Sequence, residues 1–399
     1  MSSPKSWNNR IVALALGLGL AMSAVIGPCW WSIVRYHNPV CSAYKPDFIS
    51  LYTGATLMWT DRASLYDLEK QRLVQQPLDP SRGSWVLPFF YPPFFAVALL
   101  PLAWLSFSAA FVVMTAINLA LLVAALKITI QKLQLNRQQA NWLMLATFCN
   151  YGVHYAFLEA QTSFIALFLL VLFVFTLQSS APGKPWIWSS LLFFKPQLAA
   201  TPFLILLGRK RWRDLGQVFV VIALLCLISL AAVGFEGMRA YIDISRRAAG
   251  GEDYLHIQPE GMHNLRALAY FFFAPPWRDA IWWAATIAVM ALIFVRSWVK
   301  DEAREISLTG WITILVGLIL VTPHLHSHDL VLLILPTAYV LKWAGETVPP
   351  LLSFALAGIG ILPLINTVAY SHLPPLLPIA LLIVLGADLR RATQFVSSH

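Results

Sequence analysis

The hydrophobic pattern of the chain consists of long runs that are apolar around a whole helix rather than along one stripe. The clearest are Ile11–Val34, Phe107–Leu126, Phe164–Leu177, Leu215–Val233 and Trp311–Val321. About 20 apolar residues in a helix cross the hydrocarbon core of a bilayer and satisfy every backbone group internally. The pattern therefore predicts an all-α polytopic membrane protein, with residues 1–399 forming a single membrane-embedded domain.

Basic residues predict how this domain lies across the membrane, because Lys and Arg concentrate in cytoplasmic loops. The basic clusters are Lys127/Lys132/Arg137, Arg209–Arg213, Arg296/Lys300/Arg304, Lys342 and Arg390-Arg391. Placing all of them inside predicts about eleven to thirteen membrane helices and half-helices. It also predicts an uncleaved first helix, cytoplasmic ends, and two outer loops over residues 36–93 and 234–278.

Three segments receive special assignments in this topology. Phe94–Leu105 is short and contains Pro101, which predicts a re-entrant or juxtamembrane helix on the outer side. Trp142–Phe157 is expected to cross outward. Trp186–Leu207 must have both ends inside, and Lys195-Pro196 lies at its middle, where proline breaks the backbone ladder. Two half-helices would then place a lysine at the bottom of a cavity open to the outside.

Composition and charge agree with a membrane protein and exclude several other classes. The chain is 58% hydrophobic and only 12% charged, with a mean hydropathy of +0.67. We attribute the net charge of +9 to cytoplasmic loops, because no soluble basic face is present to bind nucleic acid. Four cysteines without CxxC spacing indicate neither a zinc nor a redox site, although a Cys29–Cys41 bridge stays open.

The predicted topology gathers the unusual polar residues on the outer side of the membrane. They are Asp47, Tyr91, Gln161, Lys195, the Met262–Arg266 segment with Asn264 and Arg266, and the histidines His324, His326 and His328. Ionisable residues within or beside membrane segments are costly to bury and commonly functional. Structural alternatives stay open: Asp47 and Gln161 as helix caps, Tyr91 as part of a helix stop, and Lys195 snorkelling or paired with Glu159.

The histidine cluster allows three interpretations. Histidines spaced by two lie on one face of an extended segment, whereas on a helix only His324 and His328 would share a face. A zinc site needs a further ligand and a fixed scaffold. We therefore predict no metal, and expect contact with phosphate or sugar hydroxyls, with a solvated loop as the other alternative.

Several ordered segments carry a family resemblance. They are Asp47-Phe48 with Tyr52, Leu65-Tyr66-Asp67, Phe90-Tyr91-Pro92-Pro93-Phe94 with Pro101-Leu102, Phe194-Lys195-Pro196-Gln197 with Arg211-Trp212-Arg213, Met262-His263-Asn264-Leu265-Arg266, and the His/Asp stretch before Leu330. This set, which covers most of the chain, resembles glycosyltransferase family 87, whose members are membrane-embedded GT-C enzymes. Glu159-Ala160-Gln161 departs from the Gly-Gln that is typical of the family.

The resemblance implies a GT-C fold with an outward-facing active-site cavity in the inner or plasma membrane. It implies inverting transfer of a sugar, mannose first, from a polyprenyl-phosphate donor to a lipid or glycan acceptor, without a cofactor. Asp47 would be the base, and Lys195, His324, His326, Tyr91, Gln161, Asn264 and Arg266 would bind substrate. No nucleotide-binding motif is present in the sequence. Arabinose or glucose as the donor sugar, or a transporter or flippase, are the alternatives.

Overall fold

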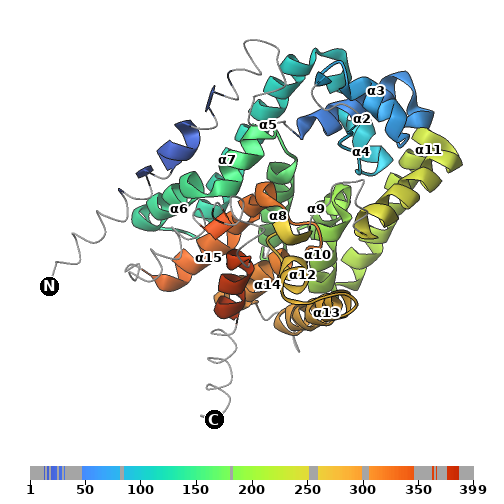
Figure 1. The fold of residues 1–399 in the computed structure, drawn as a ribbon. Coiled ribbons are helices and arrows are strands. Elements are labelled where there is room, and N and C mark those ends of the chain that lie inside the picture. The colour runs from blue at the N-terminus through green and yellow to red at the C-terminus, as the bar shows by residue number, and fades with distance from the viewer. Residues whose placement is uncertain are drawn as a thin grey trace.

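A computed structural model describes residues 47–80, 85–179, 183–250, 259–298, 305–345 and 375–385, together with a few positions within 13–31 and 362–365. Every regular element in these ranges is a helix (Figure 1). The elements that form the main body begin with α2 (Phe48–Thr60), α3 (Leu68–Gln75), α4 (Pro93–Leu99), η3 (Leu100–Trp104), α5 (Phe107–Lys132), α6 (Arg137–Cys149), α7 (Tyr151–Leu158) and α8 (Ser163–Leu177).

The second half of the chain continues the helical pattern. Its elements are α9 (Pro185–Leu191), η4 (Leu192–Phe194), α10 (Pro196–Gly208), α11 (Trp212–Gly250), α12 (Leu265–Phe272), α13 (Trp277–Ser297), α14 (Leu308–Val321), η7 (Ser327–Leu333) and α15 (Ile334–Ala344). Among the described helices, α5, α11 and α13 are long and apolar enough to cross a membrane. The predicted all-α polytopic membrane protein is therefore confirmed.

The core of the molecule is built around α8 and α14. All twelve residues from Gly310 to Val321 are buried, and α8 buries Phe164, Phe173 and Val174 completely. Because these helices are apolar on every side, neighbours must cover them all round. In Figure 1 they lie near the centre, and α5 packs on α8 while α13 and α15 pack on α14.

The predicted helix break at Lys195-Pro196 is present. Helix α9 and the short η4 turn end at Lys195, whose backbone is non-helical at φ −122° and ψ 82°, and α10 starts at Pro196. Proline fits the first position of a helix, since its missing N–H would have no partner there. The preceding residue is pushed out of the helical region by the same ring. Local chemistry is thus enough to place this break.

The predicted first outer loop and the short segment that follows it can be compared with the structure. Phe94–Leu105 forms the short α4 and the 3-10 turn η3 around Pro101, packed against α2 and α11. Within the loop lies α3, and the Asp67 carboxylate caps this helix by accepting the backbone N–H groups of Glu69 and Lys70. The buried helix α2 has no counterpart in the sequence prediction.

The segment Trp142–Phe157, predicted to cross outward, is divided between two helices. Helix α6 ends at Cys149 and α7 begins at Tyr151, with Asn150 extended between them. The Asn150 side chain accepts the N–H of Gly152 and donates to the carbonyl of Leu330 at 3.0 Å. A tertiary bond therefore holds the break, which no local pattern in the sequence marks.

The second predicted outer loop, from Gly234, begins with a helical segment. Two helices meet at a kink at Gly234 within α11, and the second of them continues to Gly250. Gly234 kinks the helix with φ 68° and ψ −176°, a conformation that is essentially restricted to glycine. The second half of α11 is therefore an ordered helix, which in Figure 1 lies on the right of the molecule.

Some expectations lie wholly or largely outside the described residues. They are the first helix at Ile11–Val34 and the Cys29–Cys41 bridge. Near the C-terminus, the described residues Leu376–Leu385 form a short apolar helix.

The kink at Gly234 yields a stability prediction. Gly234→Ala should lower the free energy of unfolding by about 1–3 kcal/mol, because the conformation is strained for any L side chain. A Cβ at Gly234 would meet no atom within 4 Å, so the effect would come from the backbone. The matched control is Gly216→Ala in the regular part of α11, where a Cβ also meets nothing within 4 Å. The control should raise stability by up to about 1 kcal/mol. Equal thermal unfolding of both detergent-purified variants would contradict the prediction.

Candidate active site

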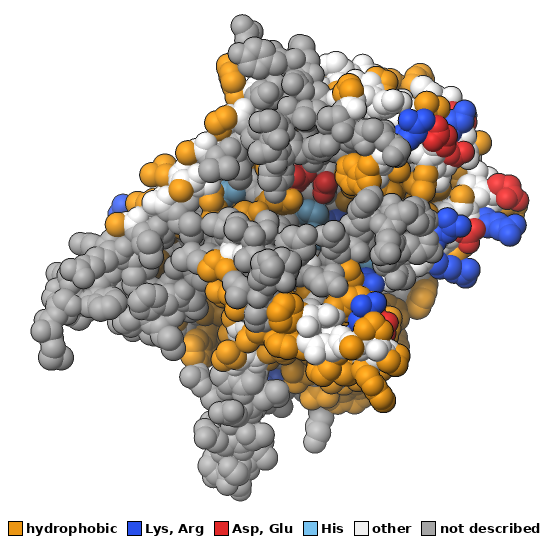
Figure 2. Space-filling model, in the orientation of Figure 1, with side chains coloured by type: hydrophobic (Ala, Val, Ile, Leu, Met, Phe, Trp, Pro, Cys, Tyr) orange, Lys and Arg blue, Asp and Glu red, His pale blue; other side chains and the backbone are white. Residues whose placement is uncertain are grey.

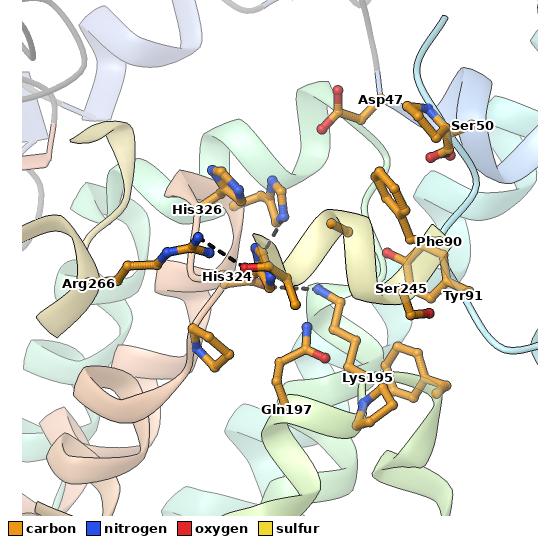
Figure 3. Close-up of a pocket in the computed structure, with 18 of the residues that line it drawn as sticks. Asp47, Ser50, Phe90, Tyr91, Lys195, Gln197, Ser245, Arg266, His324 and His326 are labelled. Carbon is orange, nitrogen blue, oxygen red and sulfur yellow. Dashed lines mark hydrogen bonds and ion pairs between the residues drawn. The ribbon is translucent and has the colours of Figure 1, made fainter. Parts of the chain in front are cut away.

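A cavity of about 620 Å³ opens among α2, α8, α10, α11, α12, α13 and the segment that precedes η7. Seven of the eight predicted site residues line it: Asp47, Tyr91, Gln161, Lys195, Arg266, His324 and His326. Figure 3 shows Asp47 on one side, Lys195 on the opposite side, and Arg266, His324 and His326 on a third. Segments far apart in the sequence thus meet in one chamber.

Asp47 stands immediately before α2 but does not cap it. The structure has no hydrogen bond from the Asp47 side chain to the first turn of α2, so the N-cap alternative is not supported. Its Oδ2 instead accepts a hydrogen bond from Gln161 Nε2 at 2.9 Å, and its backbone N–H donates to the carboxylate of Glu159. The Asp47 carboxylate is therefore directed at the cavity by contacts from the turn between α7 and α8.

That turn contains the departure from the family pattern noted in the sequence. Ala160 has φ +43°, in the left-handed region that glycine adopts more readily than alanine. The turn is otherwise well anchored: the N–H of Gln161 donates to the carbonyl of Ala156 at 3.0 Å, and Asn118 Nδ2 donates to the Gln161 carbonyl at 2.9 Å. Alanine at this position thus preserves the turn that presents Gln161 to Asp47.

Lys195 is buried and forms an ion pair that differs from both alternatives left open by the sequence. Its Nζ lies 2.7 Å from Asp329 Oδ1 and donates to Ser163 Oγ at 3.3 Å. The Ser163 hydroxyl donates to the same Asp329 oxygen at 2.6 Å. The lysine thus neither snorkels nor pairs with Glu159. Asp329 was missed as a site residue, because a sequence does not show which carboxylate a distant lysine meets.

The histidines His324 and His326 lie in the segment between α14 and η7 and face the cavity. Burial lowers the pKa of His324 to about 3, and the nearby charge of Arg266 adds to that effect. Burial also lowers the pKa of His326, against the opposing influence of Asp329. Both imidazoles are therefore neutral at physiological pH, so each can donate one hydrogen bond and accept another.

Arg266 is the most deeply buried cation of the cavity, with 1% of its surface exposed. Its Nη2 donates to the carbonyl of Ala249 at 3.1 Å, and its guanidinium lies 4.8 Å from the ring centre of Trp282. Nε and Nη1 are buried and have no hydrogen-bond partner among the described residues. A buried guanidinium with unused donors is suited to bind an anionic ligand.

Asn264 is the one predicted site residue that does not line the cavity. Its Oδ1 caps α12 by accepting the N–H of Ala267 at 3.0 Å, and its Nδ2 donates to the carbonyl of Thr322 at 2.7 Å. These contacts tie the helix of Arg266 to the segment that carries the histidines. A direct role of Asn264 in substrate binding stays a prediction.

Tyr91 forms an aromatic wall beside Lys195. Its ring stacks on Phe194 with 6.3 Å between centroids, and its hydroxyl lies 2.9 Å from that of Thr162. The backbone carbonyl of Tyr91 accepts a hydrogen bond from Tyr66 at 2.6 Å. The ring is thus fixed in place rather than serving merely as part of a helix stop.

Other lining residues were missed by the sequence interpretation. They include Tyr241 and Ser245 of α11, Asp279, Trp282 and Trp283 of α13, Tyr270 of α12, and Gln197 of α10. Those of α11 lie in the part that was predicted to be a loop. The tryptophans resemble ordinary membrane-interface residues in the sequence. The sequence interpretation would have needed to predict the second half of α11 as a helix in order to identify this part of the cavity lining.

The described helices thus enclose a cavity that contains a carboxylate, buried cations and neutral imidazoles. The model of glycosyltransferase family 87 matches residues 89–323, more than half of the chain, and the protein belongs to that family. It is therefore a membrane glycosyltransferase. The match includes Tyr91, Gln161, Lys195, Asn264 and Arg266, whereas Asp47 and both histidines lie outside it. No curated protein and no solved structure matches the chain.

The buried ion pair yields the next prediction. Asp329→Asn should destabilise the folded protein by about 3–5 kcal/mol, because it leaves the Lys195 ammonium buried without its counter-ion. The double variant Lys195→Met/Asp329→Leu removes both charges and should recover most of that loss. Thermal unfolding of the detergent-purified proteins measures both effects. A double variant no more stable than Asp329→Asn alone would show that the pair is not the stabilising contact.

Proposed function

We propose that the protein transfers a sugar, mannose first, from a polyprenyl-phosphate donor to a hydroxyl of a lipid or glycan acceptor at the outer face of the membrane. The observation that carries the proposal is the arrangement of the cavity. A carboxylate that does not cap its helix faces the chamber from one wall, and a buried arginine with two unused donor nitrogens faces it from another. Transfer from a sugar phosphate needs these two functions on different sides of the anomeric carbon.

Asp47 takes the role of the general base. The acceptor oxygen attacks the anomeric carbon while its proton passes to the Asp47 carboxylate, and the bond from that carbon to the phosphate oxygen breaks. Attack opposite the leaving group inverts the anomeric centre. Gln161 holds the carboxylate through its 2.9 Å hydrogen bond, so the base is oriented before the acceptor arrives. General-base catalysis of this kind contributes roughly 10²–10⁴-fold to the rate.

Arg266 makes the main contribution to stabilising the leaving phosphate, since its unused donors can form charge-assisted hydrogen bonds as negative charge develops. The neutral His324 and His326 supply further N–H donors from the neighbouring segment. Lys195 contributes less than its charge alone implies, because Asp329 already neutralises it at 2.7 Å. We assign it to the donor side of the cavity, with the ring of Tyr91 forming the adjoining wall.

The positions of the charges along the helices support the proposed orientation. The cavity lies at the start of α8 and α13 and at the end of α14, where residues such as Gln161 and Pro323 line it. The opposite ends of α5 and α13 carry Lys132 and Arg296. Basic clusters mark the cytoplasmic side, which supports an outward-facing cavity in a plasma or inner membrane.

Asp47→Asn tests the base directly. The variant should express, bind the lipid-linked donor and lose at least about 100-fold in transfer rate, because an amide cannot accept the acceptor proton. The measurement is transfer of labelled mannose from polyprenyl-phosphate mannose by purified protein, with glucose and arabinose donors run in parallel. Asp67→Asn is the matched control, since Asp67 caps α3 at an exposed site and asparagine caps equally well. Near-normal transfer by a folded Asp47→Asn protein would refute the assignment.

Cysteine labelling tests the orientation. In a background with the four native cysteines changed to serine, Lys70→Cys in α3 should react with an impermeant maleimide in intact cells. Gln138→Cys in α6 should react only after lysis, because it neighbours the basic cluster expected inside. Both positions are exposed, so access through the protein does not limit labelling. The reverse pattern would place the cavity on the cytoplasmic side.

A further inference from the structure

The wall of the cavity at α12 and α13 is a stack of alternating cations and aromatic rings. The Arg278 guanidinium lies 4.2 Å from the ring centre of Tyr270, and Arg266 lies 5.2 Å from the same ring. On its other side Arg266 lies 4.8 Å from Trp282. The hydroxyl of Tyr270 donates to Asp279 at 2.7 Å, which fixes the central ring. The stack leads from a partly exposed arginine to the buried one.

Several exposed residues of the cavity lining lie on this wall. Trp282 lines the cavity with 6% of its surface exposed, whereas the adjacent Trp283 lines it with 54% exposed. Ala249 and Asp279 are further exposed lining residues at the same place, at the end of α11 and the start of α13. The mouth of the cavity is therefore bordered by the Trp283 ring. It lies beside Ala249, whose carbonyl accepts a hydrogen bond from Arg266.

The surface next to the mouth is strongly aromatic. Phe272, Phe273 and Trp277, at the corner between α12 and α13, are exposed by 55%, 44% and 68%. In Figure 2 hydrophobic side chains cover the lower right of the molecule, where α13 lies in Figure 1. Aromatic residues grouped in this way belong at the interface between lipid and water. The mouth thus opens toward the membrane interface rather than to bulk water.

We infer that the corner between α12 and α13, with Trp283 at its mouth, is the subsite through which the isoprenoid tail of a lipid phosphate leaves the cavity while its phosphate is held at Arg266. The inference rests on the proposed function and specifies where the donor lipid lies. Charge complementarity fixes the occupant: a buried guanidinium with unused donors calls for an anion, and the rings that flank it continue outward as an apolar surface. A ligand that is anionic at one end and hydrocarbon at the other matches both.

The acceptor fits this corner less well. Its hydroxyl must reach Asp47, which lies on a different wall of the chamber from Arg266 (Figure 3). A free phosphate or a soluble sugar phosphate would use Arg266 but would leave the aromatic corner without a role. The two sources of the phosphate group therefore differ in one measurable respect, which is their dependence on the rings at the mouth.

The test compares donors with long and short tails. Purified full-length protein in nanodiscs is assayed with mannose linked to a long polyprenyl phosphate and to a two-isoprene phosphate. Trp283→Ala and Phe272→Ala should each raise KM for the long-tailed donor about tenfold, since a ring at the centre of a lipid contact contributes an energy of that order. The kcat for the same donor should stay unchanged, and KM for the short-tailed donor should change less than twofold.

Trp104→Ala is the matched control, because Trp104 is 65% exposed but lies on η3 and does not line the cavity. It should leave both KM values unchanged. Equal changes for the two donors, or no change for either, would overturn the tail subsite. If no donor supports transfer by the wild-type protein, the proposed function itself fails, which is a separate result.

Photo-crosslinking keeps the inference testable if the variants fold poorly. A polyprenyl phosphate with a diazirine on its first isoprene, incubated with wild-type protein, should label peptides of α12 and α13, and excess unlabelled polyprenyl phosphate should prevent labelling. Competition by inorganic phosphate alone at equal strength would indicate a simple anion site and contradict the inference. Labels confined to α5 or α8 would place the tail elsewhere and also contradict it.

Discussion

A buried lysine and a buried aspartate impose the main constraint on this structure. Both Lys195 and Asp329 are about 5% exposed or less, so neither charge is compatible with the apolar interior unless the other lies beside it. Their contact joins the break between α9 and α10 to the start of η7, and Ser163 adds the start of α8. Three chain segments are thus fixed at one point. The groups that face the cavity, including Gln161 and His326, lie within a few residues of that point and take their positions from it.

The fold could be predicted from the sequence where the controlling chemistry is local. The apolar run Trp311–Val321 lies within α14, because a continuous apolar run is enough to predict a helix. The break at Pro196 follows from the geometry of proline. The break at Asn150 does not, since a hydrogen bond to Leu330, 180 residues away, holds it. At Gly234 the apolar run marks the end of one helix, whereas the helix that follows to Gly250 was not predicted.

The candidate site was predictable because ionisable and polar groups are scarce in a membrane protein, and one topology places most of them on the same side. That reasoning brought Asp47, Lys195 and Arg266 into one cavity. It could not show that Asp329 forms an ion pair with Lys195, or that Arg266 keeps unused donors, since pairing depends on distances in the folded state. It also passed over Trp283, because an aromatic residue within an apolar segment has no distinguishing pattern. The polar residues of the site can be predicted from the sequence, whereas its apolar lining residues are identified only in the structure.

The turn between α7 and α8 shows how a departure from a family pattern can leave a site intact. A left-handed residue between Glu159 and Gln161 lets both side chains turn back toward Asp47, one to its backbone N–H and one to its carboxylate. Glycine adopts that conformation freely, whereas alanine does so at a cost of about 1–2 kcal/mol. The anchored backbone of Gln161, bonded to Ala156 and Asn118, offsets that cost. What the site requires at residue 160 is therefore a backbone conformation, and the identity of the residue matters only through its ability to adopt it.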